Sequence, residues 1–122
     1  MELLPQMTLI TEEQKQRFKE VGDQTDVENP LVIARLFVPG GYLRWHVVEY
    51  YPETQGIYAY VTGAYEEWVA VCIADLENMK LPGTLKVERD KLFKETRFDT
   101  LVANNFVIDY SEQNDEPKTL HA

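Results

Sequence analysis

The sequence predicts an α+β fold, in which an antiparallel β-meander of about five strands packs against an N-terminal helix and a short C-terminal helix. Two observations lead to this class. A single strong helix-start signal lies near the N-terminus, and short β-branched and aromatic stretches separated by Gly and Pro turn signals follow it. The 122 residues correspond to one domain, which we place at residues 1–110.

The first expected element is a helix over residues 11–21. Thr11 and Gln14 have the spacing of a capping box, and Gly22 suits the left-handed conformation that ends many helices. The apolar side of this region is thin, so we expect the helix to lie on the surface with one edge turned inward. The apolar residues are Leu9, Ile10, Phe18 and Val21.

The meander is expected to begin after a polar loop. Its first four strands are predicted at residues 31–38, 44–51, 57–62 and 68–73. Alternation in the second strand places Trp45, Val47 and Glu49 on one face, with His46, Val48 and Tyr50 on the other. We expect one core over the sheet that contains Trp45, Val47, Ile57, Ala59 and Val71.

The C-terminal third gives weaker signals. A helical turn is expected at residues 75–79, a fifth short strand at 85–88, a short helix at 97–104 and an edge strand at 106–110. Residues 111–122 are polar and lack apolar periodicity, which predicts a flexible tail.

The lone cysteine, Cys72, excludes an internal disulfide, and its apolar neighbours predict that it is buried. The N-terminus lacks the pattern of a signal peptide, and no apolar run approaches the ~18 residues of a membrane span. We therefore expect a cytoplasmic protein that does not engage a membrane.

Acidic residues outnumber basic residues by 21 to 12, giving a net charge of −9. Such a chain repels phosphate backbones, so we expect no direct binding to nucleic acid. Residues 45–79 contain no Lys or Arg, whereas residues 80–97 are basic on balance. The carboxylates of the acidic segment form either ordinary solvated surface or one acidic face that binds a partner. They are Glu49, Glu53, Glu66, Glu67, Asp75 and Glu77.

The sequence offers little catalytic chemistry. Two His residues, one Cys and one Ser form no metal-binding, phosphate-binding or nucleophile motif, so we expect no metal, no cofactor and no catalytic residue. The densest charged cluster is residues 87–90, where Glu88 and Asp90 share one face of a strand and Arg89 lies on the other. This cluster is either an ion-pair lock between the sheet and the C-terminal segment, or a ligand site built by Trp45, Glu88, Arg89 and Asp90.

Four segments together resemble a known bacterial family, catalogued as domain of unknown function 2958. They are residues 9–14, residues 34–39 followed by the Trp45 strand at 44–50, residues 73–77, and residues 85–93 with the Val-Glu-Arg-Asp block. The resemblance covers about residues 9–101 and implies a small α+β domain typical of plasmids, conjugative elements and phage-like islands. It implies no activity. The chain departs from the family at residues 71–74, where a Gly-Tyr pair and a Ser are usual.

Two functional hypotheses follow. The first is a non-enzymatic interaction protein of a mobile genetic element, whose acidic face binds a host or element protein, such as a DNA-handling or defence protein. The second is a small-ligand-binding or enzymatic module with a site around Trp45, Arg89 and Asp90. We favour the first, because the second lacks an identifiable general base.

Overall fold

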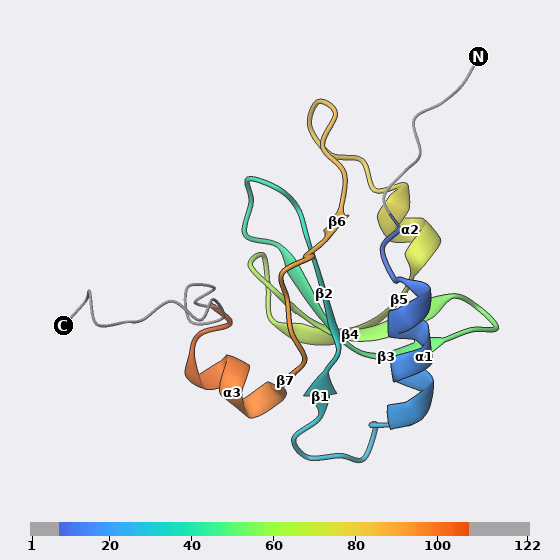
Figure 1. Ribbon diagram of the computed structural model, residues 1–122. Helices are drawn as coiled ribbons and strands as arrows, with labels where there is room; N and C mark the ends of the chain where they lie inside the picture. Colours follow the sequence, from blue (N-terminus) through green and yellow to red (C-terminus); the bar gives the residue numbers. More distant parts are fainter. Residues whose placement is uncertain (1–7, 108–122) are drawn as a thin grey trace.

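The computed structural model describes residues 8–107 and confirms the α+β class. A five-stranded antiparallel sheet has the order β5-β4-β3-β2-β6, and β1 pairs separately with β7. Figure 1 shows α1 and α2 on one side of the sheet and α3 on the other. The elements are α1 (Glu12–Val21), β1 (Leu31–Val32), β2 (Ala34–Phe37), β3 (Arg44–Tyr51), β4 (Gly56–Thr62), β5 (Glu67–Cys72), α2 (Ile73–Glu77), β6 (Glu88–Arg89), β7 (Thr96–Arg97) and α3 (Phe98–Ala103).

The start of α1 confirms the capping box. The Thr11 hydroxyl accepts a hydrogen bond from the Gln14 amide, and the Gln14 side chain accepts one from the Thr11 amide, both at 3.0 Å. Gly22 ends the helix with a positive φ of 79°. The helix contacts the sheet through Phe18, which is buried, so the expected thin apolar edge is the one that packs inward.

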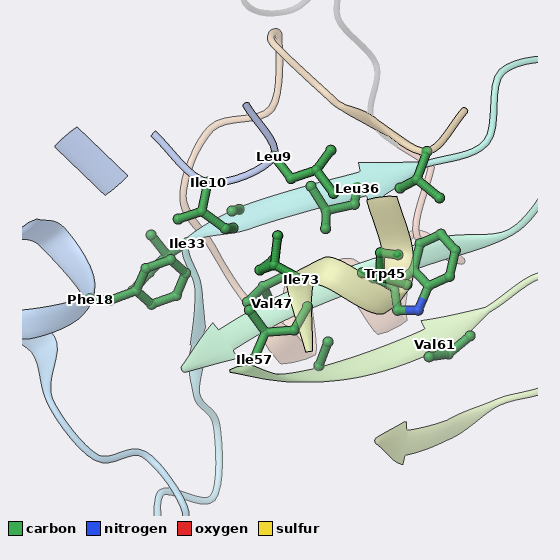
Figure 2. Packing of buried hydrophobic residues seen from close by; sticks show 14 of the residues in the cluster. Leu9, Ile10, Phe18, Ile33, Leu36, Trp45, Val47, Ile57, Val61 and Ile73 are labelled. Atoms are coloured by element: carbon green, nitrogen blue, oxygen red, sulfur yellow. The ribbon is translucent and has the colours of Figure 1, made fainter. Parts of the chain in front are cut away.

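The predicted core over the sheet is confirmed with α1 packed on it, and α2, which was not expected there, also contributes to it. Trp45, Val47, Ile57 and Ala59 are buried in it, and Val71 packs against it. Figure 2 shows Phe18 projecting from α1 toward Ile33 and Ile57. The remaining buried members come from the N-terminal segment and from β2, β4, α2 and the approach to β6; they are Leu9, Ile10, Ala34, Leu36, Val38, Val61, Ile73, Leu76 and Val87.

A second, smaller cluster lies on the opposite face of the sheet, under α3. Val32, Val48 and Leu101 form its buried centre. His46 is fully buried on this face, and its ring centroid lies 4.7 Å from that of Phe106. The C-terminal segment therefore covers the face that α1 and α2 leave open.

The strand predicted at residues 31–38 is interrupted at Ile33. Val32 packs in the second cluster, whereas Ile33 and Ala34 both belong to the first, so the alternation of faces breaks there. The chain also changes partner, because β1 pairs with β7 and β2 pairs with β3 and β6. The strand β7 was not expected, and its two residues carry no sequence pattern that could have indicated it.

The alternation expected along β3 holds only as far as Val48. The register with β4 shifts between Val47 and Glu49, which marks a β-bulge. Val48 packs in the second cluster, yet Tyr50 packs against the first. The prediction that Glu49 shares a face with Trp45 and that Tyr50 shares one with Val48 is therefore wrong.

The structure differs from three other expectations, which concern the fifth strand, the burial of Cys72 and the edge strand predicted at residues 106–110. The meander holds for β2–β5, but the fifth strand, β6, starts three residues later than expected and returns beside β2. Cys72 is exposed, because it ends the outermost strand. Phe106 does not begin a strand, since its φ is +62° and it lies in a turn; residues 108–110 and the predicted tail at 111–122 lie outside the described residues.

The remaining helices are close to expectation. The α3 helix confirms the short helix predicted at residues 97–104, whereas α2 starts two residues before the predicted turn at 75–79. No helix within residues 8–107 is both long enough and apolar enough to cross a membrane.

Candidate functional site

The acidic residues predicted to form one face are divided by the fold. Glu66 and Glu67 lie where β5 begins, and Asp75 and Glu77 lie in α2, which follows β5 directly. The six residues of β5 span about 20 Å at ~3.3 Å per residue, so the two pairs stand at opposite ends of the strand. Within the part of the chain that the structure describes, none of the four carboxylates takes part in a salt bridge.

The other two predicted acidic residues lie elsewhere. Glu53 is exposed in the turn between β3 and β4, which is close to α2 because the Ile73 amide donates to the Gln55 carbonyl at 2.9 Å. Glu49 is 5% exposed, and its carboxylate is turned into the protein. It therefore cannot contribute to an acidic binding face, and the physical reason is the bulge in β3.

The residues of the second predicted site do not assemble around a shared pocket. Trp45 is 4% exposed within the core. Asp90 instead forms an ion pair with Arg35, at 2.8 and 3.0 Å. The Arg89 guanidinium donates to the Thr8 carbonyl, and Glu88 pairs with Phe37 in the sheet. Arg89 lies opposite the core residue Leu36 and Glu88 lies opposite Phe37, so these two residues point to the opposite faces that were predicted.

The ion-pair lock exists, but its cation comes from β2. Arg35 is 5% exposed, and it also donates to the Phe106 carbonyl at 3.0 Å and lies over the Phe93 ring. It therefore joins the sheet to the segment that follows β6. The sequence-based prediction identified the carboxylate of this lock and missed its partner, because residues 35 and 90 are far apart in the chain.

A hollow lies between α1 and the end of β3, and we call it the α1–β3 groove. It has a volume of about 840 Å³ and is open to solvent. Phe18 and Tyr50 give it an apolar floor, with ring centroids 6.2 Å apart. Its other lining residues are Glu12, Lys15, Gln16, Lys19, Gly22, Asp23, Thr25, Glu49, Tyr51, Pro52 and Gln55.

Glu49 anchors the polar end of this groove. Its carboxylate accepts hydrogen bonds from the Gln24 amide at 2.5 Å, from the Thr25 hydroxyl at 3.2 Å, and from the Tyr51 hydroxyl at 2.5 Å. Burial raises the pKa of Tyr51, and the Glu49 carboxylate raises it further. The phenol therefore stays protonated and holds its hydrogen bond to Glu49 at neutral pH.

Two further groups give the groove both signs of charge. The Thr25 amide lowers the pKa of Asp23 by donating to its carboxylate, at 2.8 Å. The Glu12 carboxylate raises the pKa of Lys15, whose ammonium also lies 5.6 Å from the centre of the Tyr50 ring. Such a mixture of aromatic floor, ammonium and carboxylates can bind a small polar molecule.

Sequence reasoning missed this groove because the bulge that aims Glu49 toward Gln24 has no local sequence signal. Within residues 8–107, no group of three or more His, Cys, Asp or Glu side chains is placed to hold a metal ion.

Comparison with known proteins places the chain in a family. No curated protein and no solved structure matches it. A family model does match, over residues 9–104, a range that begins at buried Leu9 and includes every helix and strand described above. The chain therefore belongs to the family described as "Protein of unknown function (DUF2958)".

Proposed function

We propose that the chain is a non-enzymatic interaction module that binds a protein partner through what we call the acidic edge. This surface consists of β5 together with Glu66 and Glu67 at its start and Asp75 and Glu77 just after its end. The observation that carries the proposal is that β5 is the outermost strand of the sheet and has, at both ends, carboxylates that form no salt bridge with any residue between 8 and 107. Complementary charge would steer a basic partner to this edge.

The family context adds a class of partner. The resemblance to proteins of plasmids and conjugative elements supports a partner that handles DNA or serves in defence, encoded by the host or by the element, and met in the cytoplasm. Such proteins carry basic surfaces for nucleic acid. Direct binding of this chain to duplex DNA is not part of the proposal, because 21 acidic residues face only 12 basic ones; a gel-shift titration that gave a salt-sensitive micromolar complex would reverse that judgement.

The test compares two charge reversals of equal size. One variant carries Glu67→Lys and Asp75→Lys in the acidic edge, and the control carries Asp26→Lys and Glu28→Lys in the exposed loop after α1. Each protein is used to capture partners from a bacterial host of the element, with identification by mass spectrometry. We expect at least one protein that is captured by the wild type and by the control variant but not by the edge variant. Equal capture by all three proteins would contradict it.

The α1–β3 groove supports a second candidate function, the binding of a small polar ligand. The specific observation is the 840 Å³ hollow with buried Glu49 at one end and Lys15 beside an aromatic floor. A fragment screen by NMR should find compounds that shift the signals of Lys15, Tyr50 and Tyr51 together. A true ligand at ~100-fold excess over its Kd should stabilise the fold by about 2.7 kcal/mol. A screen without such shifts would count against this function.

A further inference from the structure

The outer edge of β5 offers backbone groups that no other described residue binds. In an antiparallel pair, residues alternate between those that exchange hydrogen bonds with the neighbouring strand and those that point away from it. The Ile73 amide donates to the Gln55 carbonyl, and this bond sets the phase of the alternation along β5. The amide and carbonyl groups of Trp68 and Ala70 and the amide of Cys72 therefore point outward, whereas the Cys72 carbonyl belongs to the N-cap of α2.

Apart from its carboxylates, this edge lacks the features that usually prevent strand addition. Proteins protect an edge strand with Lys, Pro, a bulge, a covering element or a short length. The strand β5 contains neither Lys nor Pro, pairs with β4 in unbroken register over six residue pairs, and ends in exposed Cys72. The opposite edge of the sheet is different, because β6 has only two residues.

We propose that the partner inserts an extended segment with basic residues at both ends, which pairs with β5 as a sixth strand of the sheet. This inference rests on the proposed function and specifies its binding mode. The amides of Trp68, Ala70 and Cys72 and the carbonyls of Trp68 and Ala70 would supply the hydrogen bonds. The carboxylates at the two ends of β5 would meet Lys or Arg placed about six residues apart, which is the length of the strand.

The same charges argue against a second copy of this chain as the added strand. A two-fold pairing centred on Ala70 would place Glu66 and Glu67 of one copy beside Asp75 of the other. Like charges next to each other oppose association, and the net charge of −9 adds to the repulsion. A basic segment removes this repulsion and gains attraction at both ends.

The neighbouring side chains define the middle of the added segment. Trp68 is half-buried on one face of β5, stacked on Tyr58 with ring centroids 5.2 Å apart. Val69 and Val71 pack against the core on the other face. Cross-strand neighbours of these side chains gain most when they are β-branched or aromatic, so the segment should alternate such residues between its basic ends.

The probe for the test is a synthetic peptide of alternating valine and threonine with two lysines at each end. Hydrogen exchange by NMR should show that the amides of Trp68, Ala70 and Cys72 become protected when this peptide is added. The amides of Val69 and Val71 already point toward β4 and should change little. Protection elsewhere, or none at millimolar peptide, overturns the inference.

Three comparisons separate the backbone from the charges. A peptide N-methylated at alternate residues keeps its charge but cannot pair with β5, and it should bind about tenfold or more weakly. Ala70→Pro removes one outward amide and keeps the pairing with β4, so it should weaken the unmodified peptide similarly. Ala70→Thr, the matched control, should bind as the wild type does.

The outcomes distinguish this inference from the proposed function. If N-methylation has no effect while Glu67→Lys with Asp75→Lys abolishes binding, strand addition is wrong and the acidic edge stands. If the peptide binds all variants equally, neither strand addition nor charge recognition takes place at the β5 edge. If sedimentation shows that the free protein pairs through β5 with a second copy, the choice of a basic partner segment is overturned.

Discussion

The burial of His46 makes the stability of the fold depend on pH in a defined window. Its Nε2 lies 3.0 Å from the Thr62 hydroxyl, and among the described residues its Nδ1 has no hydrogen-bond partner. Burial, together with the charges of Arg35 and Arg44, lowers the pKa of His46 from 6.5 to about 3. The folded protein therefore holds this imidazole neutral.

The sign and size of the effect follow from this difference. Above pH 6.5 the ring is neutral in both states, and the stabilisation is complete. As pH falls through 6.5, His46 becomes protonated in the unfolded state, whereas in the folded state it stays neutral down to about pH 3. Stability is therefore lost across this range. At about 1.4 kcal/mol per pH unit, lowering the pH from 7 to 5 should remove about 2 kcal/mol from the free energy of unfolding.

The assay is urea denaturation at pH 7 and at pH 5, for the wild type and for His46→Gln. Glutamine can still hydrogen-bond to Thr62 but does not titrate, so the variant should lose about 2 kcal/mol less than the wild type across this range. Carboxylates contribute equally to both proteins and cancel in the comparison. An equal loss in the two proteins would refute the reasoning, as would an NMR titration of His46 with a pKa near 6.5.

Three further predictions test the packing. Trp45→Ala should cost about 3–5 kcal/mol, because the indole is 4% exposed, and a melting temperature close to that of the wild type would contradict its burial. Asp90→Asn should cost about 3 kcal/mol in urea denaturation, because it removes the negative charge that lies 2.8 Å from the buried Arg35 guanidinium. Gly63→Ala should destabilise more than Gly40→Ala, since a Cβ at Gly63 would lie 2.2 Å from a backbone oxygen and one at Gly40 meets nothing; thermal unfolding of both variants checks the order.

The sequence predicted those parts of the fold whose signals are local. The capping box of Thr11 and Gln14 is a short-range pattern and sets the start of α1. The strands β3, β4 and β5 are bounded by Gly and Pro turns, so their order and antiparallel pairing follow from short connections. The core residues could be named for the same reason, because alternation along a strand determines which side chains share a face.

The candidate sites depended on features that are not local. The bulge at Val48 arises where β3 pairs with β4 on one side while β1 gives way to β2 on the other, and it moves Glu49 from the expected face into a hydrogen-bond network. The pairing of Arg35 with Asp90 likewise requires β6 to return beside β2. Neither the bulge nor the pairing leaves a pattern in a stretch of neighbouring residues. Sequence reasoning therefore named Glu49 and Asp90 as candidates, but it placed Glu49 on an acidic binding face and missed Arg35 as the partner of Asp90.

The position of the acidic residues at the exposed β5 edge explains how their charge can control which strands pair there. An exposed edge six residues long is a site of aggregation unless something opposes the wrong partners. Here Glu66, Glu67, Asp75 and Glu77 oppose a second copy of the same acidic chain, and they would also repel any other acidic strand. The only class of extended segment that these charges attract is a basic one. The carboxylates that oppose self-association of the free protein would therefore also select a basic partner.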